Sequence, residues 1–236
     1  MNKNFHLLSW IGIFAMAMGF IESAVVVYLR AIYYPEGFAF PLRSLDPGIV
    51  STEVLREAST MIMLIMIAFM TFKQAISRFA VFIYAFAIWD IFYYVFLFLL
   101  LGWPPSLLTW DILFLIPVTW VGPVLAPVIN SVTMILLALI IIFQKAKNDQ
   151  FRLTFVEWLF LLLGSAGFIF SYTQPYLQFL LAIFSISDIV NLHSSKEFLA
   201  YSGSFIPSNF NWILFSFGEV LVMYPVFHVI KRMKKA

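Results

Sequence analysis

The chain has 236 residues, of which 63% are hydrophobic and only 11% are charged, and its formal net charge is +2. A soluble domain normally carries about 25% charged residues, so these side chains are too few to cover a water-facing surface. The lack of cysteine excludes disulfides, thiolate metal ligands, iron–sulfur clusters and cysteine nucleophiles. The composition therefore predicts an integral membrane protein whose main partner is the lipid bilayer.

Six apolar runs are long enough to cross the hydrocarbon core, which takes roughly 20 residues of helix. In chain order they are residues 7–29, 54–72, 79–101, 123–143, 153–172 and 210–230. The second run is expected to extend upstream toward Pro47. We therefore predict an all-α polytopic membrane bundle of about six transmembrane helices, with residues 1–236 forming a single integral membrane domain.

Two further apolar segments do not fit as simple spans. Residues 106–120 follow a Trp-Pro-Pro sequence, and residues 176–192 are broken by polar side chains such as Asp188. A seventh span at 176–192 would send the basic tail to the side opposite the other basic loops. We therefore expect both segments to be helices lying in the outer interface of the membrane, with a seventh span as the alternative.

Orientation follows from the lysines and arginines. With six spans, one side of the membrane carries both termini and ten basic residues, namely Lys3, Lys73, Arg78, Lys145, Lys147, Arg152, Lys231, Arg232, Lys234 and Lys235. The other side carries four, Arg30, Arg43, Arg56 and Lys196. Because basic loops stay in the cytoplasm, both termini are predicted to be cytoplasmic in a cell membrane. The lack of an Asn-x-Ser/Thr sequon is typical of a prokaryotic protein.

Small residues recur at helical spacing in two of the spans. Ala15, Gly19 and Ser23 are each four residues apart, and residues 164–167 read Gly-Ser-Ala-Gly. Such stripes let two helix backbones approach closely. They predict tight helix packing, and whether they face the bundle or the lipid stays open at this point.

Carboxylates within the spans are the main functional signal. Glu22, Glu53, Glu57 and Asp90 fall in the outer half or near the middle of the predicted helices. Charged side chains in hydrocarbon are costly and normally face the bundle interior, where they mark functional sites. We therefore predict that these four acids form an acidic pocket with catalytic roles.

Other polar residues at similar depth complete this candidate site. The predicted substrate-binding residues are Arg30, Arg56, Tyr93, Tyr94 and Asp111. The acids outnumber the arginines, so some acids should be protonated, metal-bound or open to water. Glu53 and Glu57 lie one turn apart and offer oxygen ligands to a hard divalent cation. The alternative is a purely structural network in which Arg56 bridges carboxylates of neighbouring helices.

Three functions fit this pattern. The first is a membrane-embedded enzyme or binding protein that acts on an amphiphilic, lipid-like substrate at the outer acidic site. The second is a proton- or cation-coupled transporter that uses Asp90 and Glu219, both near mid-membrane. The third is a non-catalytic assembly partner, whose small-residue stripes would face lipid.

Several cofactors and partners are not expected. The sequence has no P-loop and no dinucleotide fingerprint, so no nucleotide site is predicted. Three histidines leave little room for a haem. Basic patches interleaved with aromatic residues are missing, so nucleic acid is not an expected partner.

Overall fold

The computed structural model describes residues 2–43, 46–192 and 195–233. Within these residues, six helices are long and apolar enough to cross a membrane. They are α1 (Asn2–Tyr33), α2 (Pro47–Thr71), α3 (Ala75–Leu101), α4 (Leu125–Lys147), α5 (Phe155–Leu181) and α8 (Trp212–Met233). The predicted all-α polytopic bundle is therefore confirmed.

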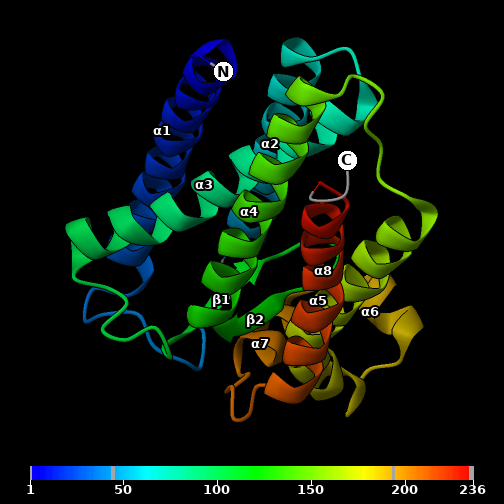
Figure 1. Ribbon diagram of the computed structural model, residues 1–236. Helices are drawn as coiled ribbons and strands as arrows, with labels where there is room; N and C mark the ends of the chain where they lie inside the picture. The colour runs from blue at the N-terminus through cyan, green and yellow to red at the C-terminus, as the bar shows by residue number, and fades with distance from the viewer. Residues whose placement is uncertain (1, 44–45, 193–194, 234–236) are drawn as a thin grey trace.

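The helices pack mainly as neighbours in a bundle, with α1 and α4 on α3, and α5 and α4 on α8 (Figure 1). Helix α2 lies against α3. The start of α1 and the last turns of α8 lie at one end of the bundle, which we call the termini end. The opposite end carries a two-stranded hairpin and the short helices α6 (Ile186–Leu192) and α7 (Lys196–Gly203), and we call it the hairpin end.

Local signals explain several helix boundaries. The Asp46 side chain accepts a hydrogen bond from the Gly48 N–H, and Pro47 occupies the first helical position of α2, as expected for a capped helix start. Helix α5 begins with a capping box between Thr154 and Glu157. Gly102, with a φ of 64°, ends α3 in the left-handed conformation that glycine tolerates.

The glycines of both small-residue stripes face the bundle interior. A Cβ atom added to Gly19 would lie 2.9 Å from the Trp89 carbonyl oxygen of α3. A Cβ atom added to Gly164 would lie 2.8 Å from the Gly218 carbonyl oxygen of α8. The Ser23 hydroxyl donates to the Tyr93 carbonyl at 2.9 Å, so α1 and α3 are also joined by a hydrogen bond. The stripe on α1 and the glycines of the second stripe therefore pack against helices of this chain, whereas Ser165 and Ala166 are exposed.

The prediction of an interfacial helix at residues 106–120 was wrong. This segment contains strand β1 (Trp110–Phe114), which pairs antiparallel with β2 (Trp120–Pro123). Pro117 lies in the connection, and proline interrupts a helix because it lacks the amide hydrogen and its ring clashes with the preceding turn. The antiparallel pairing of β1 and β2 supplies the backbone hydrogen bonds that a helix would otherwise have provided.

The segment 176–192, predicted to be one interfacial helix, is divided between two helices. Helix α5 continues through Pro175 to Leu181, and α6 is a separate seven-residue helix. Tyr176 and Leu180 are buried against the hairpin residue Val121 and against Phe205. This tertiary packing extends α5 nine residues beyond the predicted end at 172.

Candidate functional site

A cavity of about 630 Å³ opens inside the hairpin end of the bundle. Its walls come from α1, α2, α3, the hairpin, the last turns of α5, and α6 and α7. All nine residues predicted as catalytic or substrate-binding line it: Glu22, Arg30, Glu53, Arg56, Glu57, Asp90, Tyr93, Tyr94 and Asp111. The fold thus brings together side chains from four segments that are distant in the sequence.

Arg56 lies between two of the acids. Its Nε and Nη2 atoms lie 2.9 and 2.8 Å from Glu53 Oε2. Its Nη1 atom pairs with Glu22 Oε1 on α1. The Thr60 hydroxyl donates a hydrogen bond to Glu22 Oε2 at 3.4 Å. All three guanidinium nitrogens are therefore engaged, and one cation serves two carboxylates, as the structural alternative predicts for this part of the cluster.

Arg30 and Asp111 form a second buried pair, with 3.6 Å between Arg30 Nη2 and Asp111 Oδ1. The Arg30 guanidinium lies 3.8 Å from the Trp103 ring centre and 4.4 Å from that of Phe38, an arrangement that favours cation–π attraction. Arg30 and Asp111 are only 7% and 2% exposed. Arg30 Nε and Asp111 Oδ2 nevertheless have no hydrogen-bond partner among the described residues.

Asp111 lies in β1, outside the spanning helices. Burial raises the pKa of its carboxyl group to about 6, and the positive charge of Arg30 limits that rise. Asp111 is therefore poised to change its protonation state close to neutral pH.

Glu57 and Asp90 are the two acids lining the cavity that have no cation among the described residues. Glu57 Oε2 accepts a hydrogen bond from the Leu115 N–H at 2.8 Å, and Asp90 Oδ2 accepts one from the Ser131 hydroxyl at 2.8 Å. Among the described residues, neither acid has a basic nitrogen within ion-pair distance. A carboxyl group held in place beside a cavity has the chemistry needed to give or take a proton.

The two predicted metal ligands face different partners. Glu53 is paired with Arg56, whereas Glu57 is bonded to the backbone of the hairpin connection. In residues 2–43, 46–192 and 195–233, no group of three or more histidine or acidic side chains is placed to hold a metal ion. A divalent cation at Glu53 and Glu57 stays a prediction.

Glu219 belongs to a separate polar cluster between α4, α5 and α8. Its Oε1 atom accepts hydrogen bonds from Asn130 Nδ2 and from the Thr133 hydroxyl, each at 3.2 Å. The Tyr172 hydroxyl donates to Asn130 Oδ1 at 2.5 Å. Glu219 does not line the cavity, but Asn130 is adjacent in α4 to Ser131, which bonds to Asp90. The two polar clusters therefore meet at consecutive residues of one helix.

Sequence reasoning missed a third network, at the termini end. Glu157 is fully buried and joins α5 to His228 and Arg232 of α8, at 2.8 and 2.9 Å. The Thr154-x-x-Glu157 capping pattern was a visible signal for part of it. No comparable signal marked the Phe38 and Trp103 rings around Arg30.

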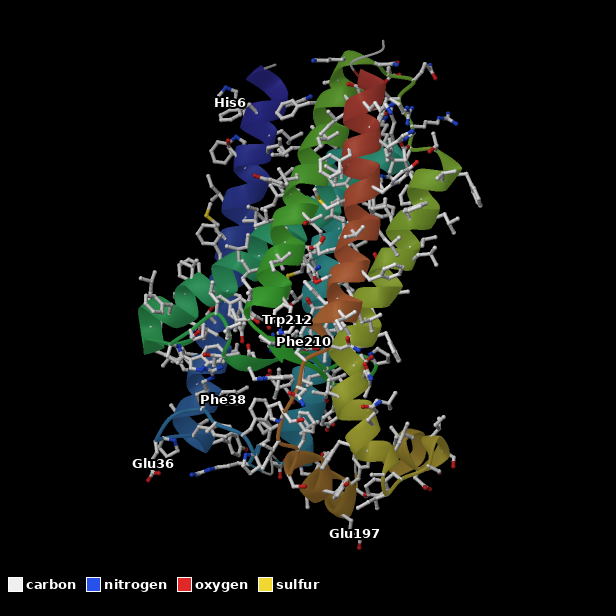
Figure 2. All side chains as sticks on the ribbon, turned by 60° about the horizontal axis from the view of Figure 1, so that its bottom comes forward. His6, Glu36, Phe38, Glu197, Phe210 and Trp212 are labelled. Atoms are coloured by element: carbon white, nitrogen blue, oxygen red, sulfur yellow. The ribbon has the colours of Figure 1, made fainter. Side chains whose placement is uncertain are left out.

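Figure 2 shows residues at the two ends of the bundle. His6 lies at the termini end, whereas Glu36 and Glu197 lie at the periphery of the hairpin end. Glu36 and Glu197 are exposed and do not line the cavity. They are therefore suitable control positions for charge changes at that end. His193, which follows α6 in the sequence, lies outside the described residues.

Comparison with known proteins adds no family to this geometry: no family model, no curated protein and no solved structure matches the chain.

Proposed function

We propose that this chain binds an amphiphilic, lipid-like small molecule in the cavity at the hairpin end, and that Glu57 and Asp90 are its acid–base groups. The observation that carries the proposal is a single cavity lined both by ionisable side chains and by apolar and aromatic ones. Its volume of about 630 Å³ lies in the range of small-molecule sites, roughly 300–1,000 Å³. A site of this composition suits a ligand with a polar head and a hydrocarbon chain.

The proposal includes an orientation. The hairpin end faces the outside of a cell membrane and the termini end faces the cytoplasm, because ten of the fourteen basic residues belong to the termini side. An amphiphile would then reach the cavity from the outer leaflet or the external water. The Arg56 triad, made of Arg56, Glu22 and Glu53, would hold α1 and α2 in place around it.

Single-cysteine blocking tests the proposal, because the natural chain has no cysteine. Val26→Cys places a thiol in the cavity wall, whereas Ile32→Cys places one on the same helix at a position that is 69% exposed. A bulky maleimide at position 26 should abolish saturable binding of a twelve-carbon amphiphile to protein in lipid nanodiscs, and the same label at position 32 should leave it intact. Binding that survives the label at position 26 would overturn the proposal.

A coupled transporter is the second candidate, and the junction of the two polar clusters at Asn130 and Ser131 favours it. In that case Glu219 would exchange a proton with Asp90 during transport. Proton uptake into proteoliposomes, driven by the amphiphile, should then disappear in Glu219→Gln and persist in Glu36→Gln. If the wild type shows no proton uptake either, the transporter candidate is excluded and only the binding function remains.

The assembly-partner hypothesis has less support than either. Its expected sign was a small-residue stripe facing lipid, and Gly19 and Gly164 instead pack against α3 and α8.

A further inference from the structure

The charges that line the cavity are unequal in number. Five carboxyl groups line it, together with three guanidinium groups. One of the three, Arg43, is exposed in the loop that follows α1, so only Arg30 and Arg56 lie deep in the cavity. The deep part therefore offers more hydrogen-bond acceptors than cationic donors.

The positive charges of the two deep arginines are already balanced by acids of the same cavity. All three guanidinium nitrogens of Arg56 are already bound to Glu22 and Glu53. Arg30 is paired with Asp111 at 3.6 Å and enclosed by two aromatic rings, and its Nε atom is buried without a hydrogen-bond partner among the described residues. An anionic head would also lie close to Glu57 and Asp90, which have no cation among the described residues. Like charges in such a site repel strongly.

Acceptors, in contrast, are available. Glu57 and Asp90 each accept one hydrogen bond through one carboxyl oxygen, and a carboxylate has room for about four. Asp111 is 2% exposed, and its Oδ2 atom is buried without a partner among the described residues. A primary ammonium group has three donors and no acceptor, so it complements these three acids.

The rest of the lining fits the same ligand. Tyr34, Phe38 and Tyr93 line the cavity, and aromatic faces attract a cation in a desolvated site. Val26, Leu29, Val54 and Leu180 provide an apolar wall for a chain.

From this complementarity we infer that the cavity selects amphiphiles with a primary ammonium head, which binds on the acidic wall to which Glu57, Asp90 and Asp111 belong, over amphiphiles with a phosphate head. The inference rests on the proposed binding function and adds the class of the head group. Binding of the ammonium form requires these acids to be ionised, so the affinity should fall as the pH is lowered.

Calorimetric titration of the protein in phosphatidylcholine nanodiscs, corrected with empty nanodiscs, tests this selectivity. The probes are dodecylamine, dodecyl phosphate, dodecyl maltoside and, as a head without a chain, ethanolamine. Dodecylamine should bind at least about tenfold more tightly than dodecyl phosphate, because a charge-assisted hydrogen bond replaces a repulsion. Ethanolamine should bind at least about a hundredfold more weakly than dodecylamine, because it lacks apolar surface to bury.

Charge-removing variants locate the head group. Glu57→Gln and, separately, Asp90→Asn should weaken dodecylamine about tenfold and leave dodecyl maltoside within about threefold of the wild type. Glu36→Gln and Glu197→Gln make the same charge change at exposed positions of the same end and should change neither affinity. Two cavity variants keep the test decisive if one of them fails to fold.

The outcomes separate this inference from the function on which it rests. Tighter binding of dodecyl phosphate, or an unchanged dodecylamine affinity in both cavity variants, would overturn the ammonium head and leave the binding function standing. Ethanolamine that binds as tightly as dodecylamine would overturn the requirement for a chain. No saturable binding by any twelve-carbon probe would overturn the proposed function itself.

Discussion

The two ends of the bundle each bury a glutamate, but the two glutamates differ in how many partners they have. At the termini end, Glu157 is fully buried, and its oxygens are bonded to the Thr154 N–H at 2.6 Å and to Arg232 and His228 of α8. At the hairpin end, Glu57 is also 92% buried, since only 8% of it is exposed, yet it has one backbone hydrogen bond and faces a cavity.

The contrast separates a carboxylate whose partners are complete from a carboxylate that keeps unused acceptors beside a cavity. A buried charge whose partners are complete stabilises one arrangement of helices, and losing a partner is costly. A buried charge with unused acceptors beside open space has a cost that a bound ligand would remove. Both ends carry glutamate, so the difference lies in the surroundings and not in the residue type.

Arg56→Met should have the largest effect on stability, because it leaves Glu22 and Glu53 buried without their shared cation. Breaking a buried ion pair from one side costs about 3–5 kcal/mol. For a chain of this length, that corresponds to a fall in Tm of roughly 10 °C, measurable by thermal unfolding in micelles. Arg43→Met, at an exposed position, is the control and should change Tm by less than about 2 °C. If Arg56→Met lowered Tm by less than about 3 °C, the Arg56 triad would not be important for stability.

The pH dependence of Asp111→Asn should give the next largest effect. Because burial raises the pKa of Asp111 from 3.8 to about 6, the stability that its proton contributes is present below pH 4 and lost as the pH rises through 6. Asparagine does not ionise, so the variant does not lose stability in this way as the pH rises. Its free energy of unfolding, relative to wild type, should therefore rise by about 2 kcal/mol between pH 4 and pH 7.

Asp188→Asn is the matched control for that experiment. Hydrogen bonds from the hydroxyl and backbone N–H of Ser185 lower the pKa of Asp188, so its contribution has the opposite sign and is lost as the pH falls. A difference between Asp111→Asn and wild type that stays flat from pH 4 to pH 7 would contradict the burial of an ionisable Asp111.

Glu157→Ala should destabilise the fold at the termini end without touching the cavity at the hairpin end. It removes the capping box of α5 and the tie to α8, which should cost about 2 kcal/mol and lower Tm by about 5 °C. Glu157→Gln keeps an acceptor for the cap and should lose about half as much. A weaker affinity for the amphiphile in either variant would show that the two ends are coupled.

Glu57→Gln should have the smallest effect on stability, within about 1 kcal/mol of the wild type, because glutamine can still accept the Leu115 N–H bond and carries no charge to desolvate. Its Tm should therefore match the wild type or exceed it slightly, while dodecylamine binding falls. A large decrease in Tm would show that Glu57, like Glu157, stabilises the fold.

The residues that determine the helices could be recognised from the sequence. Long apolar runs must become helices in a bilayer, because only a helix satisfies every backbone group within a single segment. The hairpin at 110–123 and the end of α5 at Leu181 could not be recognised in this way. The composition of a short apolar run does not tell a strand from a helix. Tyr176 and Leu180 are helical because they pack against residues that are distant in the sequence.

The positions of Glu22, Glu53, Glu57 and Asp90 along their helices were readable from the sequence alone, since each apolar run gives the approximate bounds of its helix. The tertiary structure decided the partner of each acid. Arg56 pairs with Glu53 and Arg30 with Asp111, whereas Glu57 is bonded to a backbone N–H and Asp90 to a hydroxyl. Rotation of each helix about its axis and the placement of the hairpin set these pairings. Both depend on close packing between segments far apart in the chain, which composition and periodicity do not specify.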